Sequence, residues 1–185
     1  FNIEQYAQNS SAAIQIIVEA ERRSYADRSL YLGDPDFINI PQDSLLDKVY
    51  LSDRMSSFNF DQASKSSDIN PGTIIWNESE QTTHYSILDP MGNAVAVTTT
   101  LNGSYGSKVF VESGGYFLNN EMDDFSSKPG YPNMFGLIGG KANAIAPEKR
   151  MLSAMTPTIV EKNGKLSMIV GTPGGSTIIT SVLQL

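Results

Sequence analysis

The sequence predicts an α+β fold, because two kinds of apolar spacing follow one another along the chain. Between residues 11 and 28, apolar side chains recur every three or four positions, which is the period of an amphipathic helix. In the runs 82–88 and 94–100, β-prone residues alternate between the two faces of a strand. We therefore expect helices in the first part of the chain and antiparallel hairpins in the second.

Two helices and a connector account for the residues before Thr82. The first helix is expected over residues 11–28, with Ile14, Ile17 and Val18 on its apolar side and Glu19, Arg22 and Arg23 on a charged face. The spacing of Leu and Val predicts a second helix over residues 41–55. Residues 56–81 are rich in Ser, Asp, Asn and Gln, which predicts a long, mobile connector.

The first hairpin joins residues 82–88 and 94–100 through a turn at 89–93. If this loop is symmetric about Met91, Thr82 faces Thr100 across the open end of the hairpin. One face then carries apolar side chains and is expected to pack on a core: Tyr85, Ile87, Val95 and Val97. The opposite face is more polar and is expected to line a site.

A second hairpin is predicted from residues 158–162 and 165–170, which flank the two-residue turn Asn163-Gly164. Symmetric pairing about this turn sets Pro157 opposite Val170, so the loop at 152–154 is expected near residues 171–175. Ser176 is expected to cap a helix that continues to the end of the chain. The Gly- and Pro-rich loop 126–140 is expected to act as a lid.

Composition excludes several classes of protein. The 185 residues contain no Cys, which excludes a disulfide scaffold and a zinc-thiolate site and leaves the redox compartment open. A net charge of −7 argues against nucleic acid and anionic membranes as partners, and no apolar run is long enough for a membrane span. The chain starts at Phe1 and ends in an apolar run, so we expect it to be a piece of a longer protein.

Nucleophilic chemistry here needs an unusual base. A hydroxyl is a weak nucleophile at neutral pH, and the chain has no Cys and only one His, His84, to activate it. A threonine that begins a cleaved chain can use its own α-amino group instead. Thr82 follows the polar connector and begins a strand, so the Gln81-Thr82 bond is a candidate cleavage site. Threonine also opens many exposed strands, and the spacing alone favours that ordinary explanation.

Several motifs resemble one family. Residues 81–86 (QTTHYS), Asp89 and residues 92–98 (GNAVAVT) resemble the processing site and first hairpin of the γ-glutamyltranspeptidases, which are N-terminal-nucleophile hydrolases. Further segments resemble the family in the same order: 25–29 and 32–37 upstream, then 119–125, 129–130, 132–133, 149–153 and 171–176. The resemblance covers essentially the whole chain.

The resemblance implies a fold and an activity. It implies part of a four-layer αββα sandwich, in which residues 1–81 end the large subunit and residues 82–185 begin the small catalytic subunit. The implied activity is transfer or hydrolysis of the γ-glutamyl group of glutathione and related compounds, with an amino acid, a peptide or water as acceptor. It needs no metal and no organic cofactor. The implied location is periplasmic or secreted, and the implied partners are the remaining parts of both subunits.

The resemblance also implies a role for each site residue. Thr82 cleaves the bond after Gln81 and then serves as nucleophile, while Thr100 hydrogen-bonds it. The remaining roles are an oxyanion hole at Gly174 and Gly175, contacts to the substrate ammonium from Asn102, Glu121 and Asp124, and a contact to its carboxylate from Ser153. Carboxylates and a carbonyl acceptor suit an ammonium group, and glycine lets backbone N–H groups approach a reacting carbonyl.

The chain departs from the family pattern at three points. Ala154 stands where many members have a second serine, so one hydroxyl contact to the substrate carboxylate is missing. The lid residue is Phe135, where bacterial members often have tyrosine, so the lid lacks a phenolic hydrogen bond toward Asn102. The arginine that binds the substrate carboxylate in the family belongs to an upstream segment outside this chain. For this chain alone we expect an intact Gln81-Thr82 bond and no activity.

Other interpretations stay open at this point. Cephalosporin acylases and poly-γ-glutamate depolymerases share the framework, and an uncleaved, inactive binding or assembly unit is a further alternative. The acidic residues Glu121, Asp123 and Asp124 also fit a solvated loop and, less well, a calcium site. His84 is expected to make structural hydrogen bonds, and residues 171–176 on their own would be read as a turn before a helix.

Overall fold

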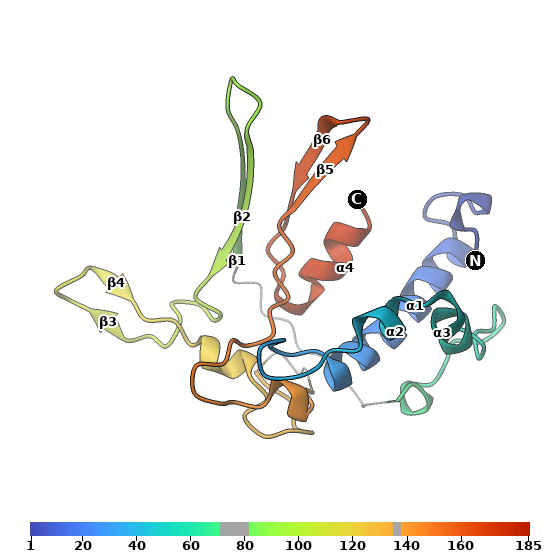
Figure 1. Ribbon diagram of the computed structural model, residues 1–185, viewed down its shortest axis with the longest axis horizontal. Helices are drawn as coiled ribbons and strands as arrows, with labels where there is room; N and C mark the ends of the chain where they lie inside the picture. The colour runs from blue at the N-terminus through green and yellow to red at the C-terminus, as the bar shows by residue number, and fades with distance from the viewer. Residues whose placement is uncertain (71–81, 135–137) are drawn as a thin grey trace. The chain divides into compact units, whose positions relative to one another are not determined.

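The computed structural model describes residues 1–70, 82–134 and 138–185 (Figure 1). These residues form two compact units. The first contains residues 1–70, 126–132 and 138–150, and the second contains residues 82–125, 133–134 and 151–185. The helices and the antiparallel hairpins confirm the predicted α+β class. Gln81 and Phe135, two residues of the expected site, lie outside the described residues.

The first unit is built around helix α1 (Ser11–Tyr31). Its N-terminus is capped by Ser10, whose hydroxyl accepts a hydrogen bond from the Ala13 N–H. The helix runs three residues beyond the predicted end at Arg28. The buried face also differs from the prediction, because Glu19 and Arg23 are buried while Ile14 is 48% exposed.

The burial of Glu19 and Arg23 has a clear physical cause. The two side chains form an ion pair one helical turn apart. Arg23 also donates to the Arg54 carbonyl at 2.7 Å and to the Ser57 hydroxyl at 2.9 Å, and the Ser64 N–H donates to Glu19 at 3.2 Å. Buried charges that are paired and fully hydrogen-bonded can occupy a core face.

The second predicted helix is in fact two short ones, α2 (Gln42–Leu46) and α3 (Lys48–Arg54). The break occurs at Asp47, whose backbone is extended. Its carboxylate accepts the N–H groups of Val49 and Tyr50 at 2.9 and 3.0 Å and so caps α3. Two 3-10 turns, η1 (Ile3–Gln5) and η2 (Ser66–Asp68), complete the early part of this unit.

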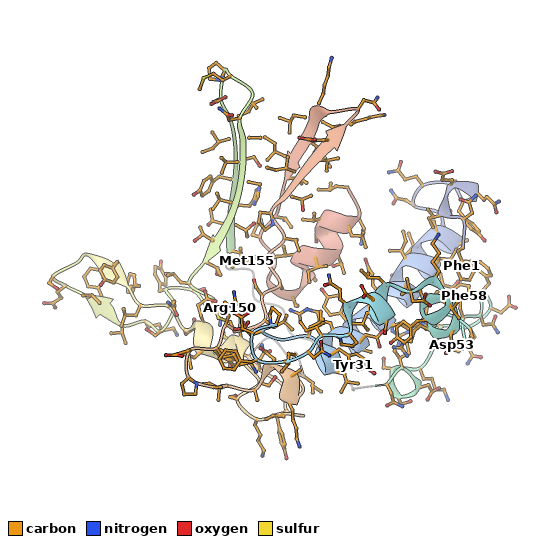
Figure 2. The ribbon with its side chains drawn as sticks, in the orientation of Figure 1. Phe1, Tyr31, Asp53, Phe58, Arg150 and Met155 are labelled. Carbon is orange, nitrogen blue, oxygen red and sulfur yellow. The ribbon has the colours of Figure 1, made fainter. Side chains whose placement is uncertain are left out.

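Residues 56–70 of the predicted connector make specific contacts within the first unit. The rings of Phe1, Phe58 and Phe60 pack edge to face, with centroids 4.9 Å apart for Phe1 and Phe58 and 4.7 Å apart for Phe58 and Phe60. Phe1 and Phe58 are labelled in Figure 2. Ile69 is buried, and Ser64 is bound to Glu19 as described above. Aromatic contacts and α1 therefore anchor this stretch. The rest of the predicted connector, residues 71–81, lies outside the described residues.

The later segments of the first unit return to the end of α1. The Gly140 N–H donates to the Ser29 carbonyl at 2.8 Å, and the 3-10 turn η4 (Lys141–Asn143) lies against α1. Within the predicted lid 126–140, the Gly130 N–H donates to the Gly139 carbonyl at 3.0 Å. Most of that loop is therefore bonded into the first unit.

The second unit contains the predicted first hairpin with its predicted register. Strands β1 (Thr82–Leu88) and β2 (Ala94–Thr100) pair antiparallel, and Thr82 lies opposite Thr100. The turn is fixed by Asp89, whose carboxylate accepts the N–H groups of Met91 and Asn93 at 2.9 and 2.8 Å.

The two faces of this hairpin differ from the prediction. The face expected to pack on a core carries Tyr85, Ile87 and Val95, which are 46, 53 and 47% exposed. The polar face is the more covered one, because strand β6 (Lys165–Val170) lies against β1 and β2 (Figure 1).

The register of the second hairpin is shifted from the prediction. Strand β5 (Thr158–Lys162) pairs with β6 around Asn163-Gly164 as expected. A bulge between Val160 and Glu161 then sets Thr158, not Pro157, opposite Val170. One extra residue on β6 accounts for the shift.

Two elements complete the second unit. A short hairpin, β3 (Phe110–Val111) and β4 (Tyr116–Phe117), was not predicted. The chain closes with a 3-10 turn η5 (Gly175–Thr177) and helix α4 (Ile178–Leu183). The cap of α4 is Thr177 and not Ser176, because the helical turn already starts at Gly175. No helix among the described residues is both long and apolar enough to cross a bilayer.

Candidate active site

The open end of the first hairpin brings two threonines together. Thr82 and Thr100 are direct cross-strand partners. Such partners share one face of the hairpin and have Cβ atoms about 5 Å apart. Both residues are half-buried. A pocket of about 370 Å³ opens here, and it is lined by Thr82, Thr83, Thr99, Thr100, Leu101, Gly103 and Tyr105.

The Thr100 hydroxyl is held in a defined position. Its oxygen accepts a hydrogen bond of 2.9 Å from the Asn102 N–H. The backbone that follows Thr100 therefore orients its hydroxyl, on the face of the hairpin that also carries Thr82.

Asn102 has an unusual backbone and a buried side chain. Its φ is 73°, a left-handed conformation that asparagine tolerates better than most residues, and it is only 6% exposed. Its side-chain amide donates to the Asn120 carbonyl at 3.1 Å and makes a weak contact of 3.8 Å with the Met134 sulfur. The amide is therefore fixed next to Thr100.

Asn120 makes hydrogen bonds to the backbone on both sides of Asn102. Its side-chain oxygen accepts the Gly103 N–H at 2.8 Å, and its own N–H donates to the Leu101 carbonyl at 3.1 Å. Its side-chain nitrogen lies 3.4 Å from the Met134 sulfur. Asn120 thus holds the residues on both sides of Asn102, although the sequence did not single it out.

The expected ammonium-binding carboxylates follow Asn120 directly. Glu121 and Asp124 begin and end the 3-10 turn η3 (Glu121–Asp124). The Asn119 side chain fixes the start of this turn by accepting the Glu121 N–H at 3.0 Å. Burial raises the pKa of Glu121 above the ordinary value for a glutamate. Both carboxylates are therefore tied to Asn102 through the continuous segment 119–124.

The third acid of this run has a different role. Asp123 accepts the Met134 N–H at 2.9 Å, and its carbonyl accepts a longer bond from the Asn133 amide. It therefore fastens the loop before Phe135 to η3. No group of three His, Cys, Asp or Glu side chains suited to a metal ion occurs in the part of the chain that the structure describes. The calcium interpretation thus has no support in these residues.

Ser153 lies in the segment before β5. It is exposed, and its hydroxyl oxygen accepts the Met155 N–H at 3.1 Å (Met155 is labelled in Figure 2). Ala154 beside it offers no polar group, as the sequence shows.

Gly174 and Gly175 follow β6 and have backbones that favour glycine. Their φ angles are 140° and 51°. The Gly174 carbonyl accepts a bond of 2.8 Å from the Thr177 hydroxyl, which fixes the turn before α4. Consecutive residues with such conformations can aim neighbouring N–H groups at one anionic oxygen.

His84 makes its hydrogen bonds within the first hairpin, and its ring packs against Gly171 just after β6. Its ring nitrogens lie 2.8 Å from the Thr98 hydroxyl and 3.1 Å from the Ser86 hydroxyl. A Cβ on Gly171 would overlap the imidazole ring. These contacts confirm the expected structural role of His84 and explain why glycine stands at position 171.

The expected site residues are thus connected to different degrees. Thr82 and Thr100 are cross-strand partners, Thr100 is hydrogen-bonded to Asn102, and Asn120 links Asn102 to the segment of Glu121 and Asp124. Ser153, Gly174 and Gly175 flank the second hairpin, whose open end pairs Thr158 with Val170 and whose strand β6 lies against β1 and β2.

The γ-glutamyltranspeptidase family profile matches residues 1–185. The chain belongs to this family. The glutathione hydrolase proenzyme of Escherichia coli (strain K12) is 52% identical over 185 residues, which are 100% of this chain and 32% of that protein. A solved structure of acivicin-inhibited γ-glutamyltranspeptidase matches with a TM-score of 0.53 and 62% identity, over 55% of this chain and 54% of that one.

Acylase relatives are more distant. The acylase ACY 1 proenzyme of Pseudomonas sp. (strain SE83) is 34% identical over 176 residues, which are 95% of this chain and 29% of that protein. This γ-glutamyltranspeptidase chain therefore spans about a third of the length of the curated relatives it matches.

Sequence reasoning missed two positioning residues of this γ-glutamyltranspeptidase chain, Asn120 and Asp123. Both act through a side-chain oxygen that accepts a backbone N–H far along the chain, at Gly103 and Met134. The run Asn-Asn-Glu-Met-Asp-Asp carries a weak signal for such roles, because Asn and Asp accept backbone bonds at turns. It does not reveal which N–H is bound.

Proposed function

We propose that the protein containing this chain is a self-processing enzyme that transfers or hydrolyses the γ-glutamyl group of glutathione and related compounds, with Thr82 as its nucleophile. The observation that carries the proposal is the pairing of Thr82 with Thr100, whose hydroxyl is held by the Asn102 N–H at 2.9 Å. Family membership supports it, as do the relatives that are glutathione hydrolase proenzymes.

The first reaction is cleavage of the chain itself. The Thr82 hydroxyl oxygen attacks the Gln81 carbonyl, the peptide C–N bond breaks, and an ester joins Gln81 to Thr82. Water then hydrolyses the ester and leaves a carboxylate on Gln81 and a free amino group on Thr82. Thr100 donates a hydrogen bond to the attacking oxygen and orients it. The related acivicin-inhibited enzyme is also described as autoprocessing, which supports this step.

The second reaction is acyl transfer. The free amine of Thr82 takes the hydroxyl proton, and the oxygen attacks the γ-carbonyl of the donor. The N–H groups at Gly174 and Gly175 stabilise the oxyanion. The amide C–N bond breaks, and the leaving amine receives the proton. An amino acid, a peptide or water then attacks the γ-glutamyl ester and restores the Thr82 hydroxyl.

Substrate recognition uses the fixed polar groups around Asn102. The donor ammonium is bound by the Asn102 side chain, Glu121 and Asp124, whose segment is held by Asn120. The Ser153 hydroxyl binds the donor carboxylate, and Phe135 closes over the site as part of a lid. With Ala154 in place of a second serine, the carboxylate relies more heavily on groups outside this chain.

The larger architecture is part of the same proposal. Residues 1–81 form the end of a large subunit and residues 82–185 the start of a small one, within a four-layer αββα sandwich. Partners are the remaining parts of both subunits, and the protein is periplasmic or secreted. Both the family and the share of the relatives that the chain spans support this division.

The test uses the full-length protein and its Thr82→Ala variant. Wild type is expected to split before Thr82 and to release the amine from a γ-glutamyl anilide, whereas the variant stays whole and inactive. Denaturing gels, intact mass and amine release measure this. A panel of γ-glutamyl amides, acyl-cephalosporins and poly-γ-glutamate separates the acylase and depolymerase alternatives. A Thr82→Ala protein that still splits would refute the assignment.

The chain of 185 residues has its own expected outcome. Without the rest of both subunits, we expect the Gln81-Thr82 bond to stay intact. Intact mass should give a single species near 20.1 kDa, and two pieces that separate before Thr82 would contradict this.

A further inference from the structure

The first unit contains residues from both sides of the proposed cleavage point. Residues 1–70 precede Thr82, whereas residues 126–132 and 138–150 follow it. Once the Gln81-Thr82 bond is cut, only non-covalent contacts hold these two sets of residues together. The inference below rests on that proposed cut and concerns the contacts that cross it.

Asp34 and Arg150 form an ion pair between the two sets. The Asp34 side chain is 1% exposed. One of its oxygens accepts the backbone N–H and the Nε–H of Arg150 at 2.8 and 3.1 Å, and the other accepts from the guanidinium at 2.6 Å. These hydrogen bonds hold the pKa of Asp34 well below its usual range.

A second carboxylate completes the arrangement. Asp36 also binds the guanidinium of Arg150, and the Asp36 N–H donates to Asp34 at 3.2 Å. The fork of Arg150 therefore spans two carboxylates of one turn that lies before the cut (Arg150 is labelled in Figure 2). An arginine is suited to this because its donors lie in one plane.

Close backbone contacts lie beside the ion pair. The Gly140 N–H donates to the Ser29 carbonyl at 2.8 Å. A Cβ on Gly33 would overlap the carbonyl of Ala142, and one on Gly140 would lie 2.7 Å from the Ser29 carbonyl. Glycine at both positions allows two backbones from opposite sides of the cut to approach directly.

Lys149 reinforces the same surface. Its ammonium donates to the carbonyls of Ala142 and Ala144 at 2.8 and 2.9 Å, and it lies 5.8 Å from the centre of the Phe37 ring. Lys149 thus stabilises the backbone at Ala142, which lies against Gly33. It also contacts Phe37, a residue that precedes the cut.

We propose that Asp34, Arg150 and the Gly33 and Gly140 contacts form a clamp that keeps the two cleavage products together. Cutting the chain converts an intramolecular contact into one between two molecules, so the effective concentration that held the surfaces together is lost. The buried carboxylate of Asp34 needs Arg150 in either case, because an unpaired buried charge is costly. The clamp therefore matters more for the cut protein than for the uncut one.

The experiment uses the full-length protein in a Thr82→Ala background, with a recognition site for a sequence-specific protease inserted before residue 82. Cutting with that protease produces the two pieces whether or not the protein processes itself. Arg150→Gln removes the guanidinium, Asp34→Asn removes the carboxylate charge, and Lys141→Gln is the matched control, an exposed cation from the same segment. Separation of the pieces in mild urea is followed by size exclusion and native mass spectrometry.

In the cut protein, Arg150→Gln is expected to separate about tenfold faster or more, because a hydrogen bond to a charged group is lost. Asp34→Asn should act in the same direction, and Lys141→Gln should match the parent. Uncut Arg150→Gln should remain folded in the same urea, as judged by circular dichroism. Equal separation rates for Arg150→Gln and the parent overturn the clamp. So does loss of structure in the uncut variant under these conditions, since the pair would then serve the fold in general.

A failure of the proposed function gives a different result. If the wild-type protein never splits before Thr82, self-processing is refuted, yet the protease-cut proteins still report on the clamp.

Discussion

At the scale of single residues, the feature that decides the chemistry is the position of two hydroxyl groups. Thr82 and Thr100 share one face at the open end of β1 and β2. The N–H of Asn102 donates to the Thr100 hydroxyl oxygen and so fixes its position on that face. This arrangement could be predicted from the symmetry of the turn around Met91, because a cross-strand partner depends only on loop length.

A Thr100→Val substitution tests this arrangement. Valine keeps the shape of threonine but has no hydroxyl, so the full-length protein should lose turnover by about a hundredfold, in the range of a lost transition-state hydrogen bond, and should process more slowly. The measurement is kcat with a γ-glutamyl anilide, together with the rate of chain cleavage. Thr98→Val is the matched control, because the Thr98 hydroxyl meets His84. Equal activity of Thr100→Val and wild type would contradict the role.

The raised pKa of Glu121 leads to a pH dependence. A raised pKa means that Glu121 takes up a proton at a higher pH than an ordinary glutamate as the solution is acidified. The neutral form cannot attract an ammonium group, so KM for the donor should rise as the pH falls through this pKa. Glu121→Gln should have a higher KM at neutral pH and lack this acidic limb. The exposed Glu112→Gln should leave the profile unchanged, and an unchanged profile for both variants would exclude Glu121 from the site.

At the scale of elements, the two hairpins show how far a pattern predicts register. The carboxylate of Asp89 closes the turn before β2 and leaves the symmetric pairing intact. The Asn163-Gly164 turn was also predicted, but the bulge at Val160 shifts its open end by one residue. A bulge is decided by local packing and backbone twist, which alternation of residues does not encode.

The same limit applies to helix α1 and to the bonds around Asn102. Burial of Glu19 and Arg23 depends on Ser57 and Ser64, more than thirty residues further along. The hydrogen bond of the Asn120 side chain likewise depends on the N–H of Gly103, 17 positions earlier in the chain. Periodicity predicts which elements form, whereas contacts of this range appear only once the chain is folded.

The glycine turn after β6 carries the prediction at this scale. Gly174 has φ of 140°, and a Cβ there would lie 2.9 Å from the Thr177 hydroxyl. Gly174→Ala should therefore strain the turn, misplace its N–H groups and lower kcat by about a hundredfold. The matched control is Gly115→Ala in the turn between β3 and β4, where φ is 69° and nothing lies within 4 Å of a Cβ. Steady-state assays of the full-length protein should give a kcat near that of wild type for Gly115→Ala. Full activity of Gly174→Ala would exclude this turn from the oxyanion hole.

At the scale of the whole molecule, buried charge makes the first unit sensitive to acid. Burial alone would raise the pKa of Glu19. The hydrogen bonds from Arg23 and Ser64 and the charge of Arg22 outweigh it and lower the pKa from 4.5 to about 2. A lowered folded-state pKa contributes stability that is present above pH 4.5 and is lost as the pH falls toward 2.

The expected size of this contribution is about 3 kcal/mol at neutral pH. Urea unfolding of the full-length protein between pH 7 and pH 3 should show it as a steady loss of stability in the transition that includes α1. Glu19→Gln should be less stable at pH 7 but should change less with pH. Parallel pH dependences for the variant and wild type would mean that another group is responsible.

The outer side of the first hairpin has a practical consequence. This face of the two-stranded sheet carries apolar side chains that are about half exposed to solvent: Tyr85, Ile87 and Val95. Strips of this kind on strands promote self-association. The 185-residue chain produced on its own should therefore aggregate as its concentration rises. The Ile87→Lys substitution should delay the onset of turbidity.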